Sequence, residues 1–246
     1  MKSLSVNVIE LETEAFNNKA VLCPTLISDG KDAILIDAGM PGSLNQIQAE
    51  MEKQGLSLGQ LRAIIITHQD LDHIGGVPEL LEAIGDGVKI FAHELDRPYI
   101  EGKLPLIKTD INKMSKQVLQ SFSDSDRELY KNPPKFKVDE IIADGDELPF
   151  FTGIKVISTP GHTPGHISLY VSEEKTLVAA DALMNINGRL IGPVPQTTLD
   201  MSTAQQSVRK LLEYEIKTLI CYHGGICEDQ VKEQLTSLVD EYSIRK

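Results

Sequence analysis

The chain has 246 residues, of which 41% are apolar and 24% are charged, and its formal charge is −12 at pH 7. This length can bury a sizeable core, whereas the acidic balance argues against nonspecific nucleic-acid binding, which needs clustered Lys and Arg. The three cysteines show no C-x-x-C spacing, so we expect no disulfide framework and a reducing compartment.

The N-terminal residues 1–10 alternate in polarity and do not form the apolar core of a signal peptide. No apolar stretch approaches the length of a membrane helix. We therefore expect a cytoplasmic protein without membrane contact.

Amphipathic helix candidates alternate with short apolar runs that suit buried strands. The helix candidates are residues 43–53, 77–84, 202–214 and 228–242. The alternation predicts an α/β fold in which helices enclose two sheets.

The most informative motif follows the apolar run 61–66 and reads T-H-Q-D-L-D-H-I-G-G over residues 67–76. His68, Asp70, Asp72 and His73 lie within six residues, at the end of a predicted strand. Imidazole and carboxylate groups together suit zinc, iron, manganese or cobalt, whereas calcium prefers oxygen ligands alone. We interpret this motif as half of a site for two metal ions.

A long segment, residues 94–144, then interrupts the rhythm of strand and loop, and it contains a polar helix candidate at 110–130. Long insertions between motifs are functional or poorly ordered. Because this one follows the first group of ligands, we expect it to roof the cleft; a peripheral, solvated excursion is the alternative.

The remaining ligand candidates also close or follow predicted strands. His162 and His166 lie in a Pro- and Gly-rich loop between the runs 154–157 and 167–171, Asp181 ends the run 176–180, and His223 ends the run 218–222. Since strand ends project side chains into a common cleft, these residues are expected to meet the motif at 67–76.

With these motifs the chain resembles the metallo-β-lactamase superfamily, whose series is H-x-H-x-D-H, a lone His in a P-G-H-T loop, a bridging Asp and a final His. The resemblance spans nearly the whole chain. It implies one domain over residues 1–246 with an αββα sandwich of two mixed sheets. It also implies two metal sites: His68, position 70 and His162 in the first, Asp72, His73 and His223 in the second, with Asp181 bridging.

Asp70 departs from this series, which has histidine at that position. With Asp70 as a ligand, two divalent ions bring four positive charges against three carboxylates and one hydroxide, and the cluster becomes neutral. Zinc is the first expected metal, and the added carboxylate biases the site toward the harder ions iron or manganese beside it. The competing interpretation is a weak or empty first site and a mononuclear enzyme.

The ligands and the resemblance predict a hydrolase that uses a hydroxide between two metal ions to attack a small-molecule substrate, a carboxylic ester, lactone or thioester. Asp72 or Asp181 would orient the nucleophile and transfer a proton. His166, Tyr222 and Arg189 are candidates for positioning or oxyanion donation. His93 is expected to be structural or to support a ligand.

Other interpretations stay open. Asp70 also suits iron-dependent redox chemistry of the flavodiiron or persulfide dioxygenase type, and a metal-stabilised binding domain without turnover is a third hypothesis. Among hydrolases, Asp181 makes the chain resemble the glyoxalase-II and lactonase branches, although the lactonase branch often has Tyr three residues after the bridging Asp, where this chain has Met184. Related enzymes commonly dimerise, so a homodimer is expected by analogy.

Overall fold

The computed structural model describes residues 4–15, 18–114 and 116–244. The first three residues of the N-terminal segment interpreted above lie outside these ranges, as does position 115 of the predicted helix 110–130. Among the described residues, no helix is both long enough and apolar enough to cross a bilayer.

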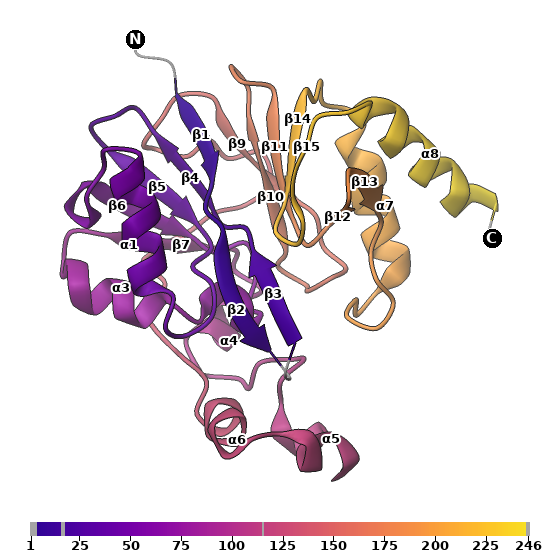
Figure 1. Ribbon diagram of the computed structural model, residues 1–246. Helices are drawn as coiled ribbons and strands as arrows, with labels where there is room; N and C mark the ends of the chain where they lie inside the picture. Colours follow the sequence, from indigo (N-terminus) through magenta and orange to yellow (C-terminus); the bar gives the residue numbers. More distant parts are fainter. Residues whose placement is uncertain (1–3, 16–17, 115, 245–246) are drawn as a thin grey trace.

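Two mixed β-sheets form the centre of the molecule (Figure 1). The first sheet has six strands in the order β1-β4-β5-β6-β7-β8, and β5 to β8 run parallel. Its strands are β1 (Ser5–Val8), β4 (Thr25–Ser28), β5 (Ala33–Ile36), β6 (Leu61–Ile65), β7 (Lys89–Ala92) and β8 (Glu140–Ile141).

The second sheet has five strands in the order β15-β14-β11-β10-β9, with β11 and β14 parallel. Its strands are β9 (Ile154–Ser158), β10 (Ile167–Val171), β11 (Thr176–Ala180), β14 (Thr218–Cys221) and β15 (Gly225–Cys227). Two hairpins stand apart from the sheets: β2 (Leu11–Ala15) with β3 (Asn18–Leu22), and β12 (Met184–Ile186) with β13 (Arg189–Ile191).

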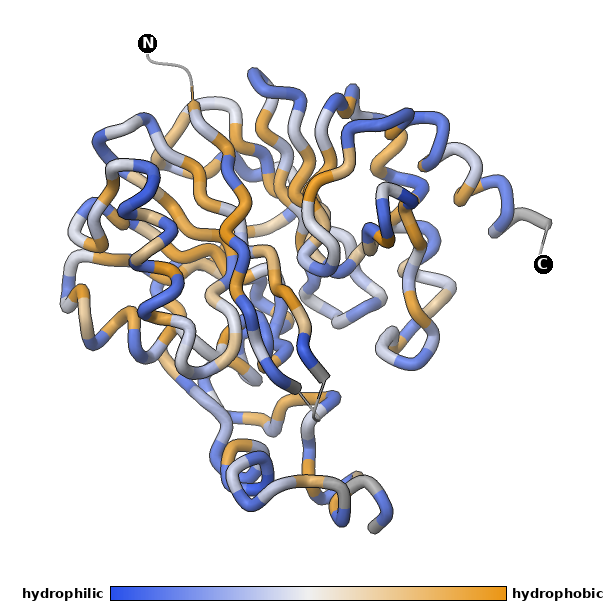
Figure 2. Tube along the Cα trace, in the orientation of Figure 1, coloured by the Kyte–Doolittle hydropathy of each residue, from blue (hydrophilic) through white to orange (hydrophobic). Residues whose placement is uncertain are grey.

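Apolar side chains fill the space between the two sheets, and they also cover the outer face of each sheet. Ile34 and Ile65 from the first sheet pack in one cluster with Val156 and Leu169 from the second. Because strand side chains alternate between faces, the neighbouring residues of each strand point outward and are covered by helices. Figure 2 shows the resulting band of hydrophobic residues through the central strands.

Helices cover the outer faces of both sheets and complete the four layers (Figure 1). Ile47 and Met51 on α1 (Leu44–Lys53), and Val77 and Leu80 on α3 (Val77–Ile84), pack on the first sheet. The helices α7 (Met201–Leu211) and α8 (Val231–Ile244) pack on the second. The predicted α/β fold, an αββα sandwich of two mixed sheets, is therefore confirmed.

The predicted helix over 110–130 is wrong as a continuous element. The chain forms a 3₁₀ turn η2 (Ile111–Lys113), α5 (Lys116–Ser121) and α6 (Asp124–Lys131). Ser123 starts α6 with a capping box, in which its hydroxyl accepts from the Asp126 amide and the Asp126 carboxylate accepts from the Ser123 amide. Such a cap satisfies amides that a continuous helix would bond internally, so it begins a new helix here.

Several short elements have no clear sequence pattern: η1 (Leu58–Gln60), α2 (Leu71–Ile74) and α4 (Arg97–Ile100).

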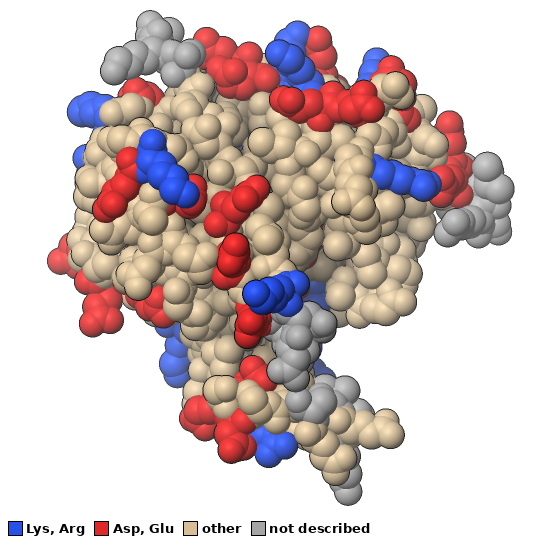
Figure 3. Space-filling model, in the orientation of Figure 1, with Lys and Arg blue, Asp and Glu red and all other residues tan. Residues whose placement is uncertain are grey.

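Cys23, Cys221 and Cys227 are free thiols and are all buried. Lys and Arg side chains lie scattered among Asp and Glu on the face shown in Figure 3, in keeping with the net charge of −12.

Candidate metal centre

The structure brings together the seven residues that the sequence predicts as ligands, at the end of the sandwich where β6, β11 and β14 finish. His68 and Asp70 follow β6, and Asp72 and His73 lie on α2. The other three are His162 in the loop between β9 and β10, Asp181 after β11 and His223 after β14.

The first cluster consists of His68, Asp70, His162 and Asp181, each offering one ligand atom within 4.8 Å of the others. His162 Nε2 lies 3.1 Å from Asp70 Oδ2 and 3.2 Å from Asp181 Oδ2. His68 Nε2 lies 3.3 Å from Asp70 Oδ2. Zinc bonds of about 2.0–2.1 Å to nitrogen and oxygen place neighbouring ligands about 3.3 Å apart in a tetrahedron. These three distances are close to that spacing, whereas His68 Nε2 and Asp181 Oδ2 lie 3.9 Å apart.

The second cluster consists of Asp72, His73 and His223, and Asp181 joins it to the first. Asp181 Oδ1 lies 3.4 Å from His73 Nε2, whereas Asp181 Oδ2 lies 3.5 Å from His223 Nε2. His223 Nε2 lies 3.4 Å from Asp72 Oδ2. The two oxygens of Asp181 thus face ligands of both clusters.

Buried polar atoms without hydrogen-bond partners show that the residues fit metal ions. His68 Nε2, His73 Nε2 and Asp181 Oδ1 are buried and unpartnered in the described part of the chain. An unpaired buried polar group costs about 1–3 kcal/mol, and a cation among these atoms would remove that cost. The chemistry of the donors, nitrogen with carboxylate oxygen, suits zinc, iron or manganese.

Asp37 orients histidines of both clusters, a role that the sequence did not reveal. His73 Nδ1 donates to Asp37 Oδ2 at 2.8 Å, and this leaves Nε2 free toward the site. Thr67 donates its hydroxyl to the same oxygen at 2.7 Å and contacts His68 Nδ1 at 3.0 Å. Carboxylates behind metal-binding histidines fix the ring and its tautomer in this way.

We expect Asp37→Asn to weaken metal affinity by about 10-fold to 100-fold, because an amide has only one accepting oxygen. It cannot accept the bonds of His73 and the Thr67 hydroxyl at one position and the Thr67 main-chain amide at the other. Titration of the metal-free protein with Zn²⁺ measures the effect. Asp32→Asn is the matched control, since Asp32 pairs with Arg62 at 2.6 Å on the surface. Equal affinities for the two variants would contradict the role of Asp37.

Proton release should accompany metal binding. Burial lowers the pKa of His223, but the charges and hydrogen bonds of Asp181 and Asp72 outweigh it and raise that pKa to about 10. At neutral pH without metal the ring therefore holds a proton that a metal ion must displace. Metal affinity should rise as the pH increases toward about 10 and fall on acidification.

Calorimetric titration with Zn²⁺ at neutral pH, in buffers of different ionisation enthalpy, measures the released protons. We expect the observed heat to change with the buffer, and to change less in His223→Ala. Heat that is independent of the buffer would contradict the prediction.

Asp96 forms hydrogen bonds with both the loop that carries His68 and the loop that carries His162. It is fully buried, and its carboxylate accepts from the Gln69 amide at 3.0 Å, the Thr163 hydroxyl at 2.7 Å and the Gly165 amide at 2.8 Å. A Cβ on Gly165 would lie 2.7 Å from Asp96 Oδ1, so glycine is required at this close approach. The contacts hold the loop with His162 against the loop with His68.

Backbone geometry directs Asp181 into the site. The pairing of β11 with β14 shifts register between Val178 and Ala180, and Ala180 has a φ of 48°. A left-handed alanine costs about 1–3 kcal/mol and persists where its surroundings impose it. The distortion turns the end of β11 so that the carboxylate of Asp181 reaches both clusters.

His166 lies behind the clusters and holds the backbone of Asp181. Its Nδ1 contacts the Thr159 hydroxyl at 2.8 Å and its Nε2 accepts from the Asp181 amide at 3.2 Å. Burial, with the neighbouring His68 and His162, holds its pKa well below the usual value, so the ring is neutral. His166 is thus a positioning residue.

The other candidates for supporting roles occupy different places. Tyr222 stacks on His73 with ring centroids 3.7 Å apart, and its hydroxyl donates to the Asp72 carbonyl, so it positions ligands. Arg189 is exposed on the β12–β13 hairpin and is not among the described residues that line the pocket over the site. His93 accepts from the Leu95 amide at 3.2 Å, which is a local structural contact.

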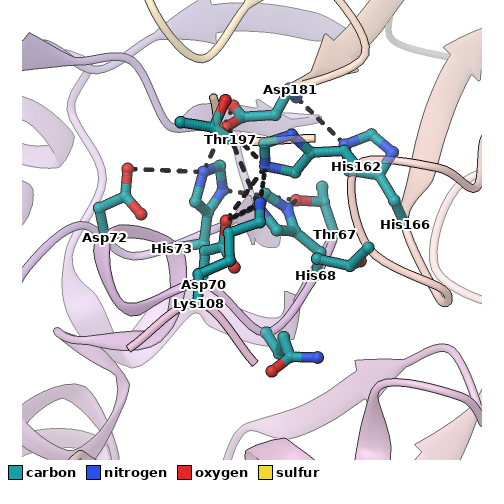
Figure 4. Close-up of polar contacts among 12 residues, drawn as sticks. Thr67, His68, Asp70, Asp72, His73, Lys108, His162, His166, Asp181 and Thr197 are labelled. Carbon is teal, nitrogen blue, oxygen red and sulfur yellow. Dashed lines mark hydrogen bonds and ion pairs between the residues drawn. The ribbon is translucent and has the colours of Figure 1, made fainter. Parts of the chain in front are cut away.

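A pocket of about 350 Å³ opens over both clusters. It is lined by five residues of the two clusters, Asp70, Asp72, His162, Asp181 and His223, and by Met184, Gly192, Val194 and Thr197. Lys108, from the segment 94–144, also lines it (Figure 4). Lys108 was not foreseen from the sequence, because no local pattern distinguishes it from a solvated lysine.

Comparisons with known proteins identify the family of the chain. Residues 24–223 match the family model described as the metallo-beta-lactamase superfamily. The chain is 32% identical over 237 residues to the probable metallo-hydrolase YflN of Bacillus subtilis (strain 168), covering 89% of this chain and 85% of that protein.

A more distant relative is a hydroxyacylglutathione hydrolase of Francisella philomiragia, 31% identical over 161 residues. The match covers 64% of this chain and 48% of that enzyme, about half its length. Among solved structures, a metallo-beta-lactamase family protein of Thermus thermophilus has a TM-score of 0.71 at 19% identity, covering 98% of this chain and 80% of that one. That likeness supports the fold.

Proposed function

Since the chain belongs to the metallo-β-lactamase superfamily and is a metal-dependent hydrolase of it, we propose that it cleaves a carboxylic ester, lactone or thioester at two divalent metal ions. One observation carries the proposal: residues of both clusters line the same pocket, and Asp181 joins the two clusters. Zinc is the first candidate for the metal, with iron or manganese as alternatives.

The first metal ion would be held by the first cluster and the second by the second cluster, with Asp181 serving both. Bound there, the ions would polarise the substrate carbonyl and make water a nucleophile near neutral pH. The protein keeps the ligands aligned through Asp37 and His166 and excludes most solvent from the buried histidines.

Asp72 is better placed than Asp181 to move a proton, because its side chain is 31% exposed and that of Asp181 only 10%. Burial raises the pKa of Asp72, but His73 and His223 outweigh this effect and lower it below the usual value. Asp72 is therefore ionised and can accept a proton from the attacking water and pass it to the leaving group.

The lining of the pocket favours an acyl substrate with an apolar portion. Met184 and Val194 line it beside Gly192, and the residues of the two clusters supply polar groups. A few polar groups on an otherwise apolar surface are typical of sites for small molecules. A thioester also has support from the relative named a hydroxyacylglutathione hydrolase, since an acylglutathione is a thioester.

Hydrolysis assays with three matched substrate classes test the proposal: aryl esters, acyl lactones and acyl thioesters of equal chain length. We expect the metal-loaded protein to cleave at least one class and the metal-free protein to cleave none. Oxygen consumption with a persulfide, without cleavage of any class, would instead favour iron-dependent redox chemistry.

The substitution Asp70→His tests the effect of Asp70 on the metal. Replacing a hard carboxylate by imidazole should shift the retained metal toward zinc while two ions still bind. Elemental analysis of the variant and the native protein, both grown in the same mixture of Zn, Fe and Mn, measures the change. An unchanged ratio of the three metals would contradict a ligand role for Asp70.

A further inference from the structure

Lys108 inserts its side chain among ligands of the first cluster. Its Nζ lies 2.5 Å from Asp70 Oδ2 and 2.5 Å from His162 Nε2, and the side chain is only 17% exposed. Figure 4 shows the ammonium pointing at these two atoms from the segment before η2. Both atoms are those that would bind the first metal ion.

A metal ion and the ammonium exclude each other at this position. The lone pair of His162 Nε2 can be directed at one cation only, and a metal ion would sit about 2.0–2.1 Å from it. Asp70 Oδ2 and Asp181 Oδ2 lie 3.1 Å and 3.2 Å from His162 Nε2, so the cluster has room for one cation among these atoms. Lys108 must withdraw before a metal binds there.

The backbone before Lys108 is fixed on the ligand motif itself. The side chain of Gln69, which is fully buried, accepts from the Ile107 amide at 2.8 Å. The main-chain amide of Gln69 in turn donates to the carboxylate of Asp96. The segment 94–144 is therefore anchored at Ile107, next to Lys108. This contact holds the main chain in a position from which the side chain of Lys108 reaches the first cluster.

Asp70 gives the ammonium a partner of opposite charge. The histidine that the superfamily's motif has at this position would offer a neutral acceptor, whereas the carboxylate of Asp70 forms an ion pair with Lys108. Within the described residues, the side chain of Lys108 makes its polar contacts with Asp70 and His162 of the first cluster. Asp70 and Lys108 therefore act as a pair.

We propose that Lys108 is a tethered cation that competes with the metal ion for the first cluster. The second cluster with Asp181 then binds a metal ion first. The first cluster binds one only when the side chain of Lys108 moves away into the pocket. This inference rests on the metal site of the proposed function. Competition of this kind weakens the apparent affinity in proportion to the fraction of molecules in which the site is free.

The test is titration of the metal-free protein with Co²⁺, whose visible absorption reports each site without an activity assay. Lys108→Met keeps the length of the side chain and removes its charge, and Lys108→Arg keeps the charge. Lys113→Met is the control, because Lys113 lies on the same segment with its side chain 73% exposed. Thermal unfolding of each variant checks its folding.

We expect the native protein, Lys113→Met and Lys108→Arg to bind one Co²⁺ tightly and a second at least about tenfold more weakly. Lys108→Met should tighten the weak site at least about tenfold and leave the tight site unchanged. Two equally tight sites in the native protein, or an unchanged affinity of the weak site in a folded Lys108→Met, would overturn the proposal for Lys108 and leave the proposed metal site standing. No Co²⁺ binding by any form would overturn it together with the proposed metal site.

Discussion

Replacing Asp181 by alanine is expected to remove metal and activity together, because its two oxygens face ligands of both clusters. Without this carboxylate, the first cluster loses one of its four ligand residues and the second loses its link to the first. We expect about one metal ion or less per chain. The rate of hydrolysis should fall by about a hundredfold to a thousandfold or more, because the metal ions that would stabilise the reacting oxygen are lost with this carboxylate.

Elemental analysis and the hydrolysis assay on the same preparation measure both effects. Asp240→Ala, on the exposed side of α8, is the control and should keep both properties. Full metal content in a folded Asp181→Ala would show that this residue does not bridge, whatever happened to the rate.

Stripping the metal ions is expected to lower the melting temperature by about 10 °C as well as to abolish hydrolysis. Ligand binding at a concentration about 1,000 times the dissociation constant stabilises a fold by about 4 kcal/mol, and a domain of this size shifts by about 2–4 °C per kcal/mol. The centre joins loops from both sheets, and bound cations would also relieve the repulsion among Asp70, Asp72 and Asp181.

Thermal unfolding before and after dialysis against a chelator measures this shift. Adding Zn²⁺ back should restore both the melting temperature and the activity, and Asp181→Ala should respond much less to the chelator. A melting temperature that does not change in the native protein would mean that the clusters contribute little to the fold.

The candidate ligand residues could be brought together from the sequence because their motifs follow buried strands. The runs that became β6, β11 and β14 are apolar and β-branched, and their ends carry His68, Asp181 and His223. Two amphipathic helices were equally clear from their hydrophobic pattern: α1 and α3 have bounds that match the predicted ranges within a residue. These signals are local and need no knowledge of the fold.

The segment 94–144 shows where local signals fail. Its polar residues fit one helix, yet the capping box at Ser123 divides it. Nothing in the sequence singles out Lys108 either, because its role depends on Asp70, 38 positions away, and on His162, 54 positions away.

By itself, the sequence determined the kind of chemistry and the strand ends at which the ligands lie, since residue type and hydrophobic period are local properties. Tertiary structure alone decided what surrounds those ligands: Asp37 behind His73, Asp96 between two loops, and Lys108 inside the first cluster. The physical reason is that hydrogen bonds and charge pairs depend on distances in space, and distant segments acquire those distances only when the two sheets pack.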